Sequence, residues 1–252
     1  MTDCNPVTIP LEAKAQFEPA TSDDHEAVKS FPYLEAIGSL TYAAMGTRPD
    51  ICAAVRALSP FAADFGSEHV AGIKHILKYL AGCPDRGILY TRSGGPLVGW
   101  TDADWANDRL NRRSISGYVY TLAGGAISWM CKQQSTVATS STHAEYIAAA
   151  EASKELIWLR RLLMELRQDV PTPTTLHIDN RAADLLACNP VNHAATKHID
   201  VRYHYIRECI QDGSISLKLI GTKDMAADIL TKSLACTKHD RFCQMIGMET
   251  ME

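Results

Sequence analysis

The pattern of hydrophobic and polar positions changes character along the chain. Between about residues 31 and 82, apolar residues recur at helical spacing in three short runs that end at glycine or proline, which predicts three short helices. In the third run one stripe of the helix is apolar: Val70, Ile73, Ile76, Leu77 and Leu80. Such a stripe requires another surface to cover it.

From about residue 86 the pattern predicts strands. The runs GILYT, LVGWTDA, SISGYVYTLA and AISWMCK are separated by turn-forming segments, and two of these, SGGP and GG, favour hairpins. An Ala-, Leu- and Glu-rich helix follows at about 140–166. After it come the strand TTLHID, the helices RAADLLAC and HIDVRYHYIRECIQ, the strand SISLKLI and a helical tail. This order predicts the α/β class with a mixed sheet.

The same pattern divides the chain into four stretches. Residues 1–30 contain several prolines and no sustained period, so we expect an extended lead-in. We expect a small helical segment at 31–85, one mixed α/β domain at 86–247 and a tail at 248–252. A chain of 252 residues suits one domain with a smaller appendage. No repeat of about 20–50 residues is visible, which argues against solenoids and propellers.

Composition narrows the class of protein. Hydrophobic residues make up 46% and charged residues 21%, as in a globular protein. No apolar run reaches the ~18 residues of a membrane span, and the first residues lack a secretory signal pattern. We therefore expect an intracellular protein of the cytoplasm or nucleus that is not secreted and does not engage a membrane. The eight cysteines have neither zinc-finger nor disulfide-framework spacing.

Two acidic residues stand where the local pattern disfavours a carboxylate. Asp102 lies within a predicted strand, where Asp is depleted, and Asp104 on the same face is its rival. Glu145 lies in the first turn of the long helix, on the stripe that faces the core. The string from Thr142 to Glu145 also matches the T-x-x-E capping box, and spacing alone favours that capping role.

Two further carboxylates complete a candidate set. Asp179 ends the strand TTLHID, where it could equally cap the helix that follows. Asp228 is expected in the middle of a helix, where a lone Asp costs both helix propensity and desolvation. The four positions are far apart in sequence, so only a folded sheet could bring them together.

Clustered carboxylates point to metal chemistry. They repel one another unless cations neutralise them, and Mg²⁺ is a hard cation that prefers oxygen ligands. Two such ions about 3.5–4 Å apart can activate a water and stabilise the leaving oxygen of a phosphodiester. The sequence has no P-loop, no G-x-S-x-G elbow, no H-E-x-x-H helix and no G-x-G-x-x-G fingerprint. Phosphodiester hydrolysis is therefore the predicted chemistry.

Basic residues form three local groups, although the net charge is −4. Such groups are usually solvated faces, but beside a metal site they can hold the phosphates of a duplex. Three histidines near the last group fit no standard zinc spacing, and a helper role for His193 or His198 stays open. The basic groups are Arg109, Arg112 and Arg113; Arg160 and Arg161; and Lys197, His198 and Arg202.

The strings that carry these residues resemble a known family. WTDADWAND, SSTHAEYIAAAEASKELIWLRRLL, LHIDN, KHIDVRYHYIRE and DMAADILTK resemble the ribonuclease H (RNase H) domain of copia-type LTR-retrotransposon Pol polyproteins. YLEAIGSLTYAAMGTRPDICAAVRALSPF and HVAGIKHILKYLAGCPDRGILY resemble the segment that closes the reverse transcriptase in the same polyproteins. The resemblance covers roughly residues 30–247. It implies an RNase H-like fold, with a five-stranded mixed sheet flanked by helices.

The resemblance also implies an activity and a site. The family cleaves the RNA strand of RNA–DNA hybrids with an Asp, Glu, Asp, Asp set that holds two Mg²⁺ ions, for which Mn²⁺ is an alternative. Carried over motif by motif, this set is Asp102, Glu145, Asp179 and Asp228, with Asp200 as the rival of the last. His143 stands where the family more often has Glu.

Three functional readings remain in competition. The first is an active RNase H whose partner would be the reverse-transcriptase fingers and palm, since the chain has no Y-x-D-D palm string. The second is an inactive retroelement remnant that acts as a nucleic-acid-binding or interaction module. The third is another enzyme with carboxylates on the same kind of sheet, such as an integrase or a Holliday-junction nuclease, which the quoted strings disfavour.

Overall fold

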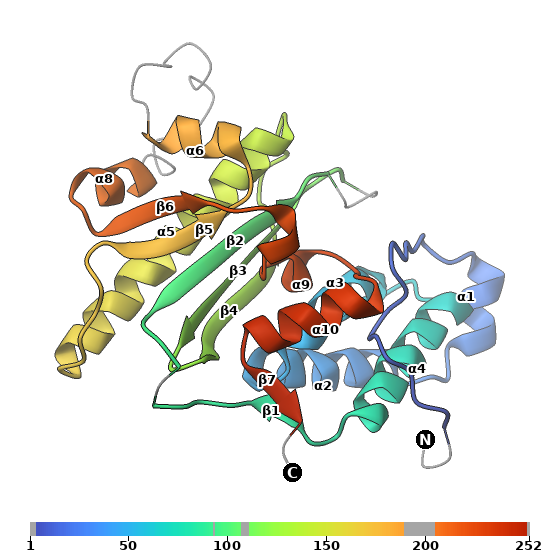
Figure 1. The fold of residues 1–252 in the computed structure, drawn as a ribbon. Coiled ribbons are helices and arrows are strands. Elements are labelled where there is room, and N and C mark those ends of the chain that lie inside the picture. Colours follow the sequence, from blue (N-terminus) through green and yellow to red (C-terminus); the bar gives the residue numbers. More distant parts are fainter. Residues whose placement is uncertain (1–3, 93, 107–110, 189–204, 251–252) are drawn as a thin grey trace. The chain divides into compact units, whose positions relative to one another are not determined.

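A computed structural model describes residues 4–92, 94–106, 111–188 and 205–250. The chain forms two compact units, which Figure 1 shows as ribbons. The unit of Leu89–Asp228 contains the large sheet and is called the sheet unit below. The unit of Met1–Ile88 with Ile229–Glu252 is mostly helical and is called the helical unit.

The sheet unit is built on five strands in the spatial order β4-β3-β2-β5-β6. The first three are antiparallel neighbours, whereas β5 runs parallel to β2 and β6 runs parallel to β5. This arrangement confirms the predicted α/β class with a five-stranded mixed sheet. The strands are β2 (Val98–Asp104), β3 (Ile115–Leu122), β4 (Gly125–Gln133), β5 (Thr174–Ile178) and β6 (Ile215–Leu219).

The turn between β3 and β4 is the hairpin that the GG string predicted. Ala123 and Gly124 both have positive φ, 55° and 87°, and lie between the paired residues Leu122 and Gly125. Two successive residues with positive φ are typical of a type I′ turn, whose twist matches that of the flanking strands.

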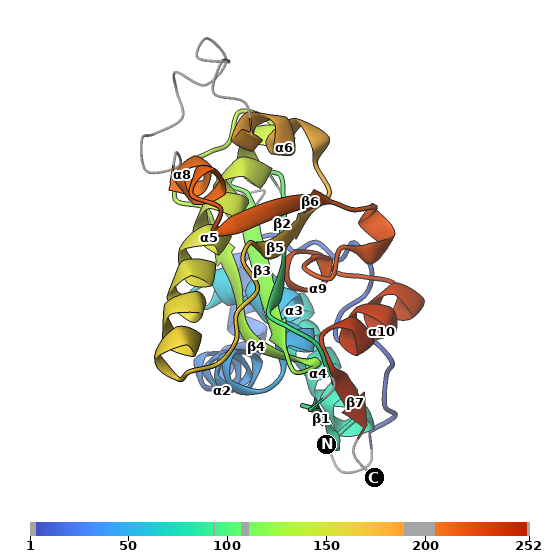
Figure 2. The same ribbon diagram turned by 60° about the vertical axis from the view of Figure 1, so that its left-hand side comes forward.

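A long helix, α5 (Ser141–Glu165), packs against β2 and β3 (Figures 1 and 2). In its C-terminal half Leu156 and Leu159 are buried in one cluster with Leu176 of β5. The Tyr120 hydroxyl of β3 donates a 2.6 Å hydrogen bond to the carbonyl of Ala152. This half of α5 is therefore fixed to the sheet by both apolar contact and a buried hydrogen bond.

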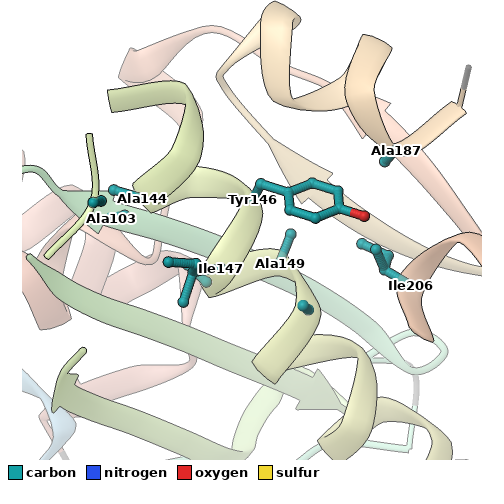
Figure 3. Packing of buried hydrophobic residues seen from close by; sticks show 10 residues of the cluster. Ala103, Ala144, Tyr146, Ile147, Ala149, Ala187 and Ile206 are labelled. Atoms are coloured by element: carbon teal, nitrogen blue, oxygen red, sulfur yellow. The ribbon is translucent and has the colours of Figure 1, made fainter. Parts of the chain in front are cut away.

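The N-terminal half of α5 packs through small side chains. Figure 3 shows Ala144 of α5 beside Ala103 of β2, while Tyr146 extends towards Ala187 and Ile206. Small residues allow a helix to approach a strand closely, so the first turn of α5 comes next to the end of β2. Two short helices between β5 and β6 supply the other partners of Tyr146, α6 (Arg181–Cys188) and α8 (Tyr205–Gln211).

The helical unit contains the three predicted helices and several elements that the sequence did not indicate. On α4 the predicted apolar stripe is buried at Val70, Ile73 and Ile76. No helix within the described residues is both long and apolar enough to cross a bilayer. The helical unit includes the helices α1 (Ser22–Val28), α2 (Tyr33–Gly46), α3 (Cys52–Leu58), α4 (Ser67–Gly82) and α10 (Cys236–Met245), with 3-10 turns η1 (Pro49–Ile51) and η2 (Ser59–Phe61).

The C-terminal part of the chain groups differently from the expected division. The strand β1 (Arg86–Ile88) pairs with β7 (Met248–Thr250), within the stretch that we had expected to be a tail. The hairpin predicted at SGGP is therefore wrong, because β1 does not pair with β2. Arg86 also lies 3.4 Å from the carboxylate of Asp240 in α10. Residues 229–250 therefore belong with the helical unit rather than with the α/β domain at 86–247. The expected extended lead-in likewise contains the helix α1, capped by the side chain of Thr21.

A buried ion pair lies inside the helical unit. The Arg48 guanidinium donates to both carboxylate oxygens of Asp50, through Nη2 at 2.7 Å and Nε at 3.0 Å. The Tyr79 hydroxyl donates a 2.6 Å hydrogen bond to the same carboxylate. Burial by itself lowers the pKa of Arg48, but the hydrogen bonds and charge of Asp50 leave that pKa raised. Burial and then Asp50 raise the pKa of Tyr79.

A buried histidine makes the helical unit sensitive to acid. His69 is fully buried, and its Nδ1 accepts a 2.9 Å hydrogen bond from the backbone N–H of Gly66. Burial lowers its pKa, although the carboxylates of Glu68 and Asp24 act in the opposite direction. A second proton would occupy the nitrogen that now accepts the Gly66 bond. The folded state therefore disfavours the imidazolium form.

We expect this histidine to give the helical unit a pH-dependent stability. The unfolded chain takes up a proton below the ordinary histidine pKa of about 6.5, so stability is fully present above that pH and is lost as the pH falls below it. His69→Asn keeps an acceptor for Gly66 but cannot titrate, so it should reduce the slope of this dependence. A smaller slope should remain, because burial also lowers the pKa of His239 in the same unit. Unfolding followed by far-UV circular dichroism between pH 5 and 8 measures the effect, and an equally steep loss in the variant would contradict the assignment.

Candidate active site

Three of the four predicted carboxylates come together in the sheet unit. One oxygen from each of Asp102, Glu145 and Asp179 lies within 4.8 Å of the others. Asp102 has no exposed surface and Glu145 is 9% exposed, whereas Asp179 is half-buried. The group therefore has two carboxylates inside the protein and one towards its surface.

The parallel pairing of β2 with β5 positions the two aspartates. Trp100 pairs with His177 in this ladder, and continuing the register by two residues sets Asp102 level with Asp179. Residues two apart on a strand share a face, so both carboxylates lie on the side that Trp100 and His177 share. The two aspartates thus owe their proximity to strand register.

The glutamate reaches the group from the first turns of α5. Its Oε2 accepts a 3.1 Å hydrogen bond from the backbone N–H of Ala103, which follows Asp102 in β2. The capping interpretation favoured by spacing is wrong, because Ser140 is the N-cap and accepts from the N–H of His143 at 3.1 Å. The carboxylate of Glu145 is accordingly directed at the strand.

The capping alternative for Asp179 is also wrong. The side chain of Asn180 accepts from the N–H groups of both Ala182 and Ala183 at 3.0 Å, so Asn180 caps α6. An Asx side chain in this position is a standard helix cap. The carboxylate of Asp179 instead belongs to the acidic group.

The structure places Asp228 differently from the sequence-based expectation. Asp228 begins the short helix α9 (Asp228–Thr231) instead of lying mid-helix, and its side chain is fully buried. It is not a member of the group whose oxygens lie within 4.8 Å of one another. Its rival Asp200, and the histidines His193 and His198, lie outside the described residues.

The three carboxylates fit a divalent cation. Buried like charges repel and are costly in an apolar interior unless cations compensate them. Carboxylate oxygens are the ligands that Mg²⁺ prefers, and Mg²⁺ usually keeps several waters besides one or two carboxylates. The half-buried position of Asp179 leaves one side of the group accessible to such waters or to a substrate.

Two relatives that match nearly the whole chain are retrotransposon polyproteins. It is 42% identical over 254 residues to the retrovirus-related Pol polyprotein from transposon TNT 1-94 of Nicotiana tabacum, which covers 99% of this chain. It is 38% identical to the corresponding polyprotein from transposon RE1 of Arabidopsis thaliana over 98% of the chain. The chain belongs to the copia-type retrovirus-related Pol polyproteins. It spans 19% and 17% of the length of these two relatives.

Other known proteins are similar to only part of the chain. A secreted RxLR effector protein of Plasmopara viticola is 48% identical over 133 residues, which is 52% of the chain and 94% of the effector. LC11-RNase H1, from compost, covers 54% of the chain with 18% identity and a TM-score of 0.40, and its complex with an RNA/DNA hybrid gives 0.37. No family model matches the chain. The sheet unit has the five-stranded mixed sheet flanked by helices that the resemblance implied.

The basic groups of the Pol chain do not all lie free in solvent. Arg160 is 8% exposed and donates to the carbonyl of Pro171 and to the hydroxyls of Thr172 and Thr174. Arg160 therefore holds the loop before β5. The expectation that this basic group forms a solvated face is wrong for Arg160. Arg161 is exposed, whereas Arg109, Lys197, His198 and Arg202 lie outside the described residues.

Sequence reasoning missed Gln134, which connects β3 to the helix that carries Glu145. Its side chain is 5% exposed, and Nε2 donates to the Ser116 hydroxyl at 2.8 Å and to the Ala144 carbonyl at 2.9 Å. Ser116 pairs across the ladder with Ala103, whose N–H binds the glutamate. One amide thus fixes the first turn of α5 relative to β3. A polar residue just after an apolar strand gave no signal of this role.

We expect Gln134→Met to loosen the acidic group while keeping the fold. The change leaves the Ser116 hydroxyl and the Ala144 carbonyl without this donor, which should cost about 1–3 kcal/mol of unfolding free energy. Loss of a group that orients metal ligands typically weakens metal binding by about 10- to 100-fold. Calorimetric titration with Mn²⁺ measures the affinity. Gln133→Met, at a half-buried neighbour that bonds to Asn111, is the matched control, and equal affinities in both variants would contradict this role.

Proposed function

We propose that the chain is the RNase H of its polyprotein, a metal-dependent endonuclease that hydrolyses the RNA strand of RNA–DNA hybrids. The observation that carries this proposal is the convergence of Asp102, Glu145 and Asp179 within 4.8 Å, from three separate elements of the sheet unit. Its membership of a retrotransposon Pol family supports the same conclusion, since such elements pass through RNA and DNA forms.

The proposed catalytic set is Asp102, Glu145, Asp179 and Asp228, and these residues would also hold two Mg²⁺ ions. The ions would supply an activated water and stabilisation of the leaving oxygen. Asp102 and Glu145 provide fixed negative charge inside the protein, and the Ala103 N–H holds the glutamate in its orientation. The half-buried Asp179 provides a ligand at the surface, where a phosphate of the substrate can approach.

The charge around the site suits a nucleic-acid strand. Arg112 is exposed and Arg113 half-buried just before β3, and Lys132 is exposed near the end of β4. Ile115 of β3 pairs with both Asp104 of β2 and Gln133 of β4, so these cations lie towards the end of the sheet that carries the acidic group. Cations here would neutralise phosphates beside the cleaved bond.

The first test is cleavage of a 5′-labelled RNA–DNA hybrid by the purified chain. We expect Mg²⁺- or Mn²⁺-dependent cutting of the RNA strand that leaves 3′-hydroxyl and 5′-phosphate ends, and no cutting in EDTA. A matched RNA duplex should stay intact. Hybrid binding that ignores Mg²⁺ and is never followed by cutting would instead identify an inactive binding module. DNA strand transfer by the same preparation would indicate an integrase-like enzyme.

Membership of the family supports a proposal about where and with which partner this activity takes place. We propose that the chain works with the fingers and palm of the reverse transcriptase, since it spans less than a fifth of the two polyproteins compared. The reverse transcriptase would synthesise an RNA–DNA hybrid in the cytoplasm or nucleus. The sheet unit would then bind this hybrid at the place of its synthesis. Stimulation of cleavage by added fingers and palm would support this partnership.

A further inference from the structure

A tryptophan stands half-exposed next to the acidic group. Trp105 is 47% exposed and follows Asp104, the last residue of β2. Three residues of strand span about 10 Å, so its backbone lies close to Asp102. What distinguishes this residue from other exposed apolar side chains is its position, because part of the ring is free to contact a ligand that binds at the acidic group.

The indole of Trp105 is held in a defined position. Its Nε1–H donates a 3.1 Å hydrogen bond to the carbonyl of Ala138, a buried residue in the loop that leads into α5. The next residue, Ala106, donates its N–H to the Ser114 hydroxyl at 3.1 Å and has a positive φ of 52°. Because the only polar atom of the ring is engaged, its exposed part can offer a ligand only an apolar aromatic surface.

The surroundings of the ring indicate which ligand covers it. Val137 is 53% exposed in the same loop as Ala138, and the cations Arg112, Arg113 and Lys132 lie towards the same end of the sheet. An apolar surface flanked by cations matches a nucleic-acid strand, whose sugars are apolar and whose phosphates are anionic.

The shape of the duplex determines what the ring can touch. Bases in a duplex are stacked on one another, so a protein ring reaches sugars rather than base faces. An A-form duplex has a wide, shallow minor groove that displays its sugars. The minor groove of B-form DNA is only about 6 Å wide, which is too narrow for an indole to lie against its sugars.

We propose that Trp105 is a minor-groove contact that lets the site prefer an RNA–DNA hybrid over a DNA duplex. The inference rests on the proposed function and deepens it by naming a specificity residue. The ring lies against sugars next to the cleaved phosphate, and its bond to Ala138 keeps it in place. Covering the exposed half of the indole removes apolar surface from water, which corresponds to about 3- to 10-fold in affinity and sets the size of effect to look for.

The test compares binding of two duplexes of the same sequence. Asp102→Asn is used as the background so that cleavage does not interfere, and fluorescence anisotropy measures affinity for a labelled hybrid and a labelled DNA duplex. Trp105→Ala should weaken hybrid binding by about 3- to 10-fold and leave DNA binding unchanged. Trp105→Phe, which keeps an aromatic ring, should retain most of the preference.

Trp158→Ala is the matched control. Trp158 is 55% exposed on α5, thirteen residues beyond Glu145 and therefore about 20 Å along the helix, so its loss should not change the preference. If Trp105→Ala does not fold, Trp105→Leu keeps the apolar bulk without a flat ring and should show the same loss. An unchanged preference in the folded variant overturns the inference.

The outcomes separate this inference from the proposed function. If the wild type cleaves the hybrid and Trp105→Ala binds it unchanged, the Trp105 contact is overturned and the proposed nuclease function stands. If the wild type neither cleaves nor binds the hybrid, the Trp105 inference and the proposed function are both overturned. Equal weakening for hybrid and DNA shows general duplex binding and also overturns the specificity role.

Discussion

Asp102→Asn is expected to reduce hybrid cleavage by more than about 100-fold without unfolding the protein. Loss of an outer partner of a metal ligand already costs 10- to 100-fold, and Asp102 is a proposed ligand itself. Asn has nearly the same shape, and it removes one of the buried carboxylates that repel one another within 4.8 Å. The melting temperature without metal should therefore stay constant or rise. Single-turnover cleavage and thermal unfolding measure the two quantities.

Asp104→Asn is the control for this substitution. Asp104 lies two residues away on the same face of β2 but is not in the three-carboxylate group. It should keep activity within a few-fold of the wild type. If Asp104→Asn were inactive while Asp102→Asn cut normally, the assignment of the first ligand would move to Asp104. Asp228→Asn then measures how much the fourth proposed residue contributes.

Asp50→Leu is expected to destabilise the helical unit by about 3–5 kcal/mol. The change leaves the buried Arg48 without its ion-pair partner and removes the acceptor of the Tyr79 hydroxyl. Removing one partner of a buried ion pair is strongly destabilising, because it leaves the other charge buried and uncompensated. All four tryptophans lie in the sheet unit, so tryptophan fluorescence reports that unit whereas far-UV circular dichroism reports both.

The two spectroscopic signals should separate in this variant. We expect a lower urea midpoint by circular dichroism and an unchanged midpoint by fluorescence. Replacing both partners, Arg48→Met with Asp50→Leu, should recover much of the loss, because an apolar pair of similar volume is often no less stable than a buried ion pair. A double variant as unstable as the single one would show that the cost comes from the Tyr79 contact or from packing.

The sheet could be predicted because its signals are local. Strand-like runs between turn signals marked the five strands, and a GG string gave the β3–β4 turn, although the predicted strand GILYT does not join this sheet. The pairing of β1 with β7 could not be predicted, since strands this short have little pattern and the whole sheet unit separates them in the sequence. The helix α1 was missed in a region that prolines made look extended.

The candidate site could be predicted only in part from the sequence, for similar reasons. The resemblance supplied the carboxylates, and three of the four converge in the structure. Capping was misassigned because several neighbouring hydroxyls and Asx residues can each cap a helix, and spacing does not choose between them. The sequence suggested Thr142 with Glu145, whereas Ser140 is the actual cap. Gln134 and Trp105 matter through tertiary hydrogen bonds that no linear pattern reveals.

The pairing of β1 with β7 sets an order of assembly during synthesis. The sheet unit lies between the two parts of the helical unit in the chain, so a ribosome releases the whole sheet before it releases α10 and β7. Contacts between distant segments form late because closing a long loop costs entropy before the contact repays it. The first four helices therefore emerge with apolar surface still uncovered and depend on late-arriving residues. A fragment of residues 1–228 should contain a folded sheet unit together with an incomplete, protease-sensitive N-terminal region.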